Sequence, residues 1–154
     1  MGLFIETALS EYAQRIQGLK GQENRTFKLV LDNRLIRELI IFLNTDEQLG
    51  NDRIDSLGKQ LGFYSHATEF ITKGRKKEGE AINLNDTGAF WESWKVLVSK
   101  GNITINANPQ KEDTNLFTEY GIDVLGLTNE NLQVLINEAL NLYIKWYQRN
   151  ILPK

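Results

Sequence analysis

The chain has 154 residues, of which 41% are apolar and 25% charged, values typical of a globular protein rather than a disordered or fibrous one. Its 18 basic and 20 acidic residues give a net charge of −2, so nucleic acid and anionic membranes exert no general attraction. No cysteine is present, which excludes disulfides and thiolate chemistry. Neither a secretory signal nor an apolar run of roughly 20 residues, as a membrane helix needs, is found. We therefore expect one soluble domain over residues 1–154, made in a reducing cytoplasm.

The first sixty or so residues predict two helices separated by two short strands. Apolar residues recur every three or four positions over residues 3–19, which is typical of an amphipathic helix. Alternation over residues 27–31 favours a short strand, and the Asp-Asn pair that follows can cap a turn of helix. The apolar run at residues 39–43 favours a strand covered on both faces and is the expected centre of the core. Residues 54–61 predict a short helix between loops.

A basic loop occupies the middle of the chain. At about residues 72–80, four cations lie beside two glycines with no apolar residue to anchor them, so we expect an exposed, mobile loop. Residues 81–84 then predict a brief strand. The Asp-Thr-Gly of residues 86–88 has side-chain oxygens suited to capping a following helix, which we expect to span residues 88–95.

The last third of the chain has the clearest local signals. Residues 95–99 and 103–106 alternate on either side of a Lys-Gly-Asn turn, which predicts a β-hairpin. Residues 116–121 predict a helical turn. Thr128 can cap the closing helix, which should run over about residues 129–148.

The closing helix is apolar around much of its circumference. Its expected buried side has seven residues: Leu132, Leu135, Ile136, Ala139, Leu140, Tyr143 and Tyr147. Four more apolar residues lie off that stripe: Val134, Leu142, Ile144 and Trp146. Such a helix lies deep in a core or touches a second chain, so Leu142 and Trp146 are candidate interface residues. The predicted fold class is α+β, a small antiparallel sheet with an N-terminal helix and a long C-terminal helix packed on it.

The basic loop supports two interpretations. Lys73, Arg75, Lys76 and Lys77 meet either solvent or an acidic patch on a neighbouring subunit. Alternatively, the loop follows a phosphate backbone, with nearby tryptophans stacking on bases, in a nucleic-acid-binding module. The first interpretation is favoured because single-strand binders usually have a wider cationic groove than one loop supplies. Trp91 lies off the face that its two aromatic neighbours share, which makes it the candidate anchor of a protein interface.

Catalysis has no clear candidate in the sequence. His66 is the only histidine, so one chain cannot build a metal site on two imidazoles. Neither a Gly-x-Ser-x-Gly motif nor a phosphate-binding glycine loop is present. The acidic residues of the first half are scattered rather than regularly paired: Asp46, Glu47, Asp52 and Asp55. We therefore predict a protein that is not an enzyme and that uses no cofactor or metal.

Residues 85–93, Asn-Asp-Thr-Gly-Ala-Phe-Trp-Glu-Ser, resemble a segment of phage virion-morphogenesis proteins of the head-to-tail connector or tail-completion class, in which Asp-Thr-Gly precedes an aromatic helix. The similarity covers about residues 40–150 and is to phage and prophage proteins of Bacteroides-type hosts. Further short motifs carry it: residues 43–49, 54–58, 64–65, 73–74, 119–121 and 126–128. The chain departs from the pattern at His66, where a proline is expected, and in a more basic segment between Lys73 and Asp86.

The resemblance implies a small α+β subunit that forms a ring in the neck or tail of a virion, without catalysis of its own. The implied partners are copies of the chain and other neck, portal or tail proteins, after assembly in the host cytoplasm. A closed ring repeats one head-to-tail contact, so each subunit needs two unlike complementary patches. The candidate patches are the Trp91 surface with the spare face of the last helix, and the loop at residues 72–79. The alternative nucleic-acid module predicts an affinity for DNA that falls steeply with salt.

Overall fold

The computed structural model describes residues 23–99, 102–112 and 114–150. The helix predicted over residues 3–19 lies outside these ranges. Within them the chain is an α+β protein, as the sequence predicts, with helices and two separate pairs of antiparallel strands. None of the described helices is long and apolar enough to cross a membrane.

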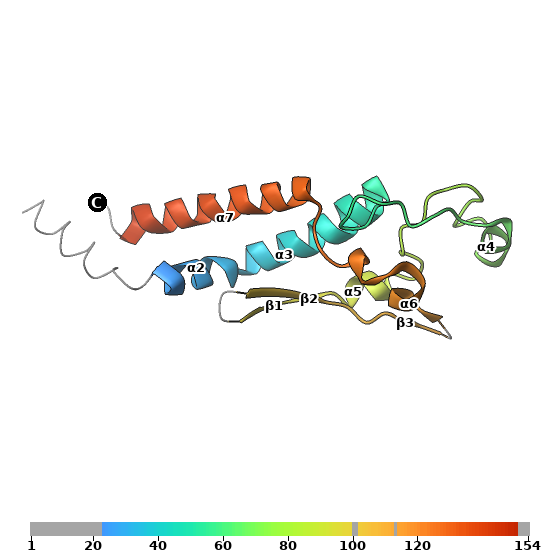
Figure 1. Cartoon of the computed structure of the whole chain (residues 1–154), viewed down its shortest axis with the longest axis horizontal. Helices are drawn as coiled ribbons and strands as arrows, with labels where there is room; N and C mark the ends of the chain where they lie inside the picture. Colours follow the sequence, from blue (N-terminus) through green and yellow to red (C-terminus); the bar gives the residue numbers. More distant parts are fainter. Residues whose placement is uncertain (1–22, 100–101, 113, 151–154) are drawn as a thin grey trace, which may run out of the picture.

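The molecule is elongated, with three layers toward one end and a projecting arm at the other (Figure 1). The layers are the hairpin of β1 (Lys95–Ser99) and β2 (Asn102–Asn106), then α3 (Arg34–Phe42), then α7 (Asn129–Asn150). The arm, residues 53–87, carries the short helix α4 (His66–Ile71). Although α3 lies between much of α7 and the hairpin, Leu135 of α7 and Val96 of β1 share one hydrophobic cluster, as expected for a long C-terminal helix packed on a small sheet.

The strand predicted at residues 27–31 is wrong, because this segment is the end of helix α2 (Glu23–Leu31). Val30 and Leu31 are neighbours in sequence and are both buried. A strand with one covered face buries alternate residues, whereas a helix packed against both α3 and α7 can bury adjacent ones.

The strand predicted at residues 39–43 is also wrong, because the segment is the second half of α3. Asn33 caps this helix, and its side chain accepts a hydrogen bond from the second helical N–H at 2.8 Å. Ile36 and Ile40 are fully buried and Leu43 nearly so, at the spacing of one helical face. The run is the centre of the core, as expected, but a run of five apolar residues does not distinguish a buried strand from a helix.

The π-helix η1 (Leu43–Asp52) continues α3 and binds the segment that precedes α7. Its side chains Asn44 and Gln48 are fully buried. Asn44 Oδ1 accepts a hydrogen bond from Gly126 N at 2.9 Å. Gln48 donates to Gly126 O at 3.0 Å and accepts from Thr128 N at 2.9 Å. This polar clamp of Asn44 and Gln48 joins the two halves of the chain and satisfies buried backbone groups.

The arm is built from turns rather than from the helix predicted at residues 54–61 and the strand predicted at residues 81–84. The Asp55 carboxylate accepts hydrogen bonds from two backbone N–H groups of the turn that follows it, each at 2.9 Å. Such local bonds compete with helix formation. Ala81 forms only an isolated bridge, and Leu84 has a φ of 56°, which interrupts an extended strand.

The predicted β-hairpin is confirmed, with β1 and β2 paired along their whole length. The helix predicted at residues 88–95 is shorter than expected, since α5 spans Ala89–Glu92. The Thr87 hydroxyl accepts a hydrogen bond from Ala89 N, the first backbone donor of α5, at 3.4 Å, although the N-cap position itself is Gly88 and has no side-chain capping bond. The chain then passes through four short elements: β3 (Gln110–Lys111), β4 (Thr114–Asn115), α6 (Leu116–Tyr120) and the 3-10 turn η2 (Ile122–Val124).

The closing helix is confirmed as α7, and Thr128 begins it as predicted, with its hydroxyl accepting a hydrogen bond from Asn131 N at 3.3 Å. The buried side is narrower than predicted. Leu135 is buried, and Ala139 and Leu142 pack beside it against the core. Three residues of the predicted buried stripe are exposed instead: Leu132, Ile136 and Leu140.

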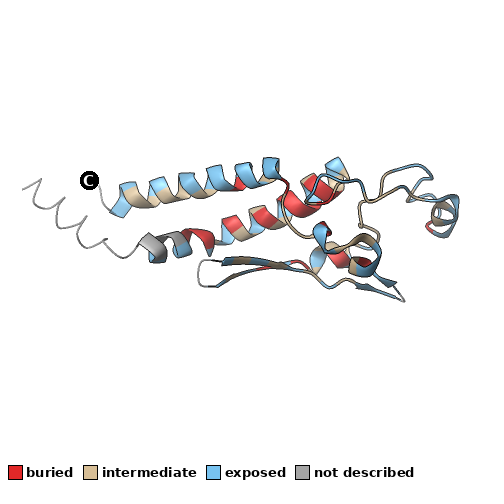
Figure 2. Ribbon diagram, in the orientation of Figure 1, coloured by how far each residue is buried: buried red, intermediate tan, exposed pale blue. Residues whose placement is uncertain are grey.

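Two hydrophobic clusters form the core of the described chain. The first joins α3, β1 and α7: Ile36, Ile40, Leu43, Val96 and Leu135. The second lies around α5 and α6: Leu49, Phe90, Trp94, Leu116 and Val124. Phe90 and Trp94 pack edge to face with ring centres 5.7 Å apart, as their four-residue spacing predicts. Within the arm only Asp55 and Thr72 are buried, so polar contacts hold much of it together (Figure 2).

Candidate functional site

One flank of α7 carries a row of apolar side chains that the described chain leaves in solvent. Figure 2 shows much of this helix in the colour of exposed residues. The row, termed the α7 stripe, has four members, each between 42% and 53% exposed: Leu132, Ile136, Leu140 and Ile144. Because four residues are slightly more than one helical turn, the four lie next to one another along the helix. Single exposed apolar residues are ordinary, whereas a continuous row of them marks an interaction surface.

The arm ends in two strongly exposed apolar residues, Phe70 and Ile71, termed the arm tip. They are 82% and 77% exposed and form the end of α4. A helix of six residues is not stable by itself, and none of its residues is buried. Ser65 caps it by accepting a hydrogen bond from Thr68 N at 3.2 Å, and the Thr72 hydroxyl donates to Thr68 O at 2.8 Å. These bonds hold the arm tip in a defined position in solvent.

The basic loop next to the arm tip is more tightly bound to the chain than the sequence predicts. Lys76 is half-buried, and its ammonium group donates to Asn83 Oδ1 at 2.9 Å and to a backbone carbonyl of the same segment. The same group lies 5.1 Å from the centre of the Tyr64 ring. The prediction of a fully exposed loop is therefore wrong at Lys76. Lys73 and Lys77 are exposed and form no ion pair within the described residues.

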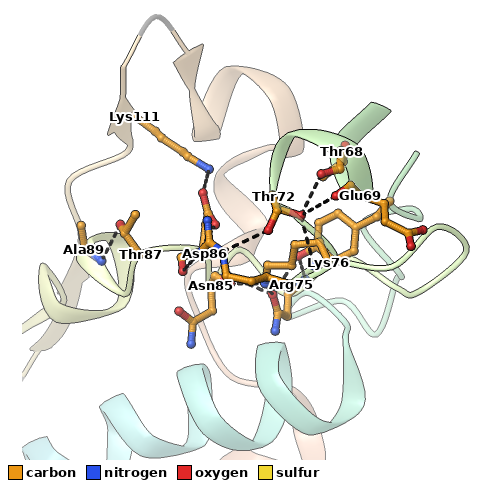
Figure 3. A network of polar contacts seen from close by, with 12 residues as sticks. Thr68, Glu69, Thr72, Arg75, Lys76, Asn85, Asp86, Thr87, Ala89 and Lys111 are labelled. Atoms are coloured by element: carbon orange, nitrogen blue, oxygen red, sulfur yellow. Dashed lines mark hydrogen bonds and ion pairs between the residues drawn. The ribbon is translucent and has the colours of Figure 1, made fainter. Parts of the chain in front are cut away.

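Asp86 joins the arm to the body (Figure 3). Its Oδ2 accepts a hydrogen bond from Lys111 Nζ at 2.9 Å. Its buried Oδ1 lies 3.3 Å from Arg75 Nη1, an ion-pair distance without hydrogen-bond geometry. The bond from Lys111 lowers the pKa of Asp86, burial opposes this, and the charges of Lys111, Arg75 and Lys76 lower it further. Asp86 is therefore an ionised tether, while its neighbour Thr87 accepts the hydrogen bond from the first backbone donor of α5.

A hollow of about 830 Å³ lies between the arm and the body. Apolar and polar side chains alternate on its wall, among them Phe63, Tyr64, Lys76, Asp86 and Tyr120. Burial raises the pKa of the Tyr120 phenol, and the neighbouring Glu119 carboxylate raises it further. A phenol with a raised pKa is a poor source of protons near neutral pH, so Tyr120 is not suited to act as a general acid in this hollow.

His66 lies on the surface of α4 and pairs with an acidic neighbour. Its Nδ1 is 3.1 Å from Glu78 Oε2, and Glu69 Oε2 accepts a hydrogen bond from Glu78 N at 2.8 Å. The nearest ligand atoms of the three side chains lie within 4.8 Å of one another, so the group has the donors for a cation. The same contacts also close the loop behind α4, a structural role that requires no metal ion.

The six predicted interface residues differ in how much surface they offer. Trp91 is half-buried against the second core cluster, and Leu142 packs on the first. Trp146 is half-buried and stacks on a neighbouring tyrosine. Two loop cations, Arg75 and Lys76, bind groups within the chain, whereas Lys77 is exposed and its ammonium group has no partner among the described residues. Their roles at an interface stay predictions.

The sequence predicts a spare apolar face on the last helix but places it only partly correctly. Ile144 is exposed as expected, and Leu135 and Ala139 lie on the buried side as expected. Leu142 packs on the core instead of facing solvent, whereas three residues expected to be buried are exposed: Leu132, Ile136 and Leu140. For the arm tip the sequence holds no signal of exposure, because a Phe-Ile pair in a short helix is usually buried.

Comparison of the chain with protein-family models, curated proteins and solved structures finds no match. The resemblance to connector and tail-completion proteins therefore stays a prediction about class. What the exposed surfaces can do follows from their own residues, which are apolar, accessible and held in place by the surrounding structure.

Proposed function

We propose that this chain is a structural subunit of a phage virion that forms a ring in the neck or tail, as a head-to-tail connector or tail-completion protein. Its work is to hold surfaces together, through contacts with copies of itself and with portal, neck or tail proteins. The observation that supports this most directly is the α7 stripe, since no described segment covers it. Removing apolar surface from water is worth about 25 cal/mol per Å², so such a row favours association.

Two groups with displaced pKa values, Asp86 and Tyr120, suit a binding role better than general acid or base catalysis. Asp86 has a lowered pKa and is held by two cations, which suits a permanent charge pair. Tyr120 has a raised pKa, which makes its phenol less available as a proton donor near neutral pH. A general acid or base works best when its pKa lies near the working pH, and both shifts lead away from it.

The alternative, a nucleic-acid-binding module, has weaker support from the loop geometry. Arg75 and Lys76 bind carboxylate and carbonyl oxygens of the chain itself, which leaves Lys73 and Lys77 to meet phosphates. Two phosphate contacts correspond to a slope of about −1.8 when the logarithm of the DNA-binding constant is plotted against the logarithm of the salt concentration. DNA affinity with a much steeper slope, abolished when Arg75, Lys76 and Lys77 are changed to alanine, would favour this alternative.

The proposal is tested in particles of a phage that encodes the chain. Electron microscopy of particles carrying a tagged copy should place the tag at the junction of head and tail. Changing Ile136 and Leu140 to aspartate should yield filled heads and free tails that do not join. The control is Asn137→Asp, which adds a charge at an exposed polar position of the same helix and should leave assembly intact. Particles that join normally without the chain would contradict the proposal.

A further inference from the structure

Resting on the proposed function, we propose that the arm tip of one copy seats on the α7 stripe of the next copy. Phe70 and Ile71 form a compact apolar knob, and the α7 stripe is an extended apolar row, so the two surfaces are unlike and can complement each other. Figure 1 shows α4 at one end of the long axis and α7 running along the opposite part of the molecule. One chain therefore does not close this contact on itself.

The charges beside the two surfaces are opposite. Residues 72–77, directly after the arm tip, contain four cations and no acid. In α7, Glu130 and Glu138 lie along the part that carries the stripe, and the two cations of the helix, Lys145 and Arg149, lie at its C-terminal end. Neither of these glutamates, nor Lys73 or Lys77, forms an ion pair within the described residues. Contact between the surfaces brings Lys73 and Lys77 near Glu130 and Glu138, which favours encounter and fixes orientation.

A symmetric contact between two α7 stripes pairs fewer charges and covers less apolar surface than a contact between arm tip and stripe. It leaves Glu130 and Glu138 of each helix to be offset only by Lys145 and Arg149 at the end of α7, while the cations of both basic loops stay in water. A symmetric contact also stops at a dimer, because both copies use the same surface, and it leaves both arm tips in water. The contact between tip and stripe is heterologous, so every subunit uses both surfaces and a ring closes when the rotation permits.

Cysteine cross-linking tests the contact directly, because the natural chain has no cysteine. Ala67→Cys places a thiol on α4 one turn before the arm tip, and Gln133→Cys places one beside the α7 stripe; both positions are exposed. The two variants are mixed at a concentration where the wild-type chain assembles and are then oxidised gently. Thr104→Cys, exposed on β2, replaces Ala67→Cys in the control mixture.

The expected product is a covalent pair joined between positions 67 and 133, well above the yield of the control mixture. Adding Phe70→Asp to the Ala67→Cys chain should lower that yield roughly tenfold or more, because the central apolar anchors of an interface carry most of its energy. Preferential joining of Gln133→Cys chains to one another would overturn the inference while leaving self-association intact. A mixed yield no higher than the control, with a wild-type chain that stays monomeric and outside the particle, would overturn the proposed function as well.

Discussion

Gln48→Ala tests whether the polar clamp holds the two halves of the chain together. The change removes the donor to Gly126 O and the acceptor of Thr128 N, both of them contacts across about eighty positions of sequence. Because Gln48 is fully buried, the two backbone groups are left without partners, at about 1 to 3 kcal/mol each. The expected loss is roughly 2 to 5 kcal/mol of the free energy of unfolding, a large part of the ~5 to 15 kcal/mol of a typical domain.

Urea unfolding followed by circular dichroism measures this loss. With a denaturant slope of about 1 to 3 kcal/mol per molar, the midpoint should fall by at least about 0.7 M. Gln133→Ala is the matched control, since it makes the same substitution at an exposed position of α7 and should change stability by less than about 0.5 kcal/mol. Because Asn44 binds the same residue, Gly126, the Asn44→Ala and Gln48→Ala changes should not be additive. A loss below about 1 kcal/mol for Gln48→Ala would refute the clamp.

Three further predictions concern stability and are checked by urea unfolding. Ile40→Ala should cost about 2 to 5 kcal/mol because Ile40 is fully buried in the first core cluster, whereas Leu35→Ala, exposed on the same helix, should cost far less. The folded pKa of Asp86 lies below its ordinary value of 3.8, so its stabilisation is present above that pH and is lost as the pH falls through 3.8 and the lower folded pKa. The stability gap between wild type and Asp86→Asn should therefore be constant from pH 7 to pH 5 and shrink below about pH 4; a constant gap at pH 3 would contradict this. Phe70→Asp should leave monomer stability within about 0.5 kcal/mol, because the ring is in solvent, and a larger loss would show that the arm tip packs within its own chain.

The elements that the sequence predicts correctly are those whose signals are local. The β1–β2 hairpin follows from two alternating segments and the turn between them. The start of α7 follows from Thr128, whose hydroxyl caps it as expected. Both depend on residues within a few positions of one another, so no knowledge of the distant chain is needed.

The errors occur where distant segments decide the outcome. Residues 27–31 and 39–43 are apolar enough for strands, but they form helices, and both of these helices pack against α7. The same cause explains the misplaced face of α7, since burial of Leu135 depends on where α3 and β1 lie. Periodicity identified an apolar helix and could not state which part of its circumference the monomer covers.

The candidate site was only partly predictable. The cationic character of residues 72–77 is visible in the sequence, but the partners of Lys76 and Arg75 are not, because Asn83 and Asp86 reach them through turns without a sequence signature. The arm tip could not be predicted, because nothing in the sequence distinguishes it from a buried segment. Apolar pairs such as Phe70 and Ile71 are usually buried, and only the structure shows that this pair is exposed.

The central claim, that the chain works by joining surfaces through the α7 stripe, is tested most directly by sedimentation velocity. The wild-type chain should form species larger than a monomer as its concentration rises, alone or on addition of portal and neck proteins. The variant with Ile136 and Leu140 changed to aspartate should remain monomeric while keeping the circular dichroism spectrum of the wild type. A variant that assembles like the wild type, or a wild-type chain that stays monomeric with and without those proteins, would contradict the claim.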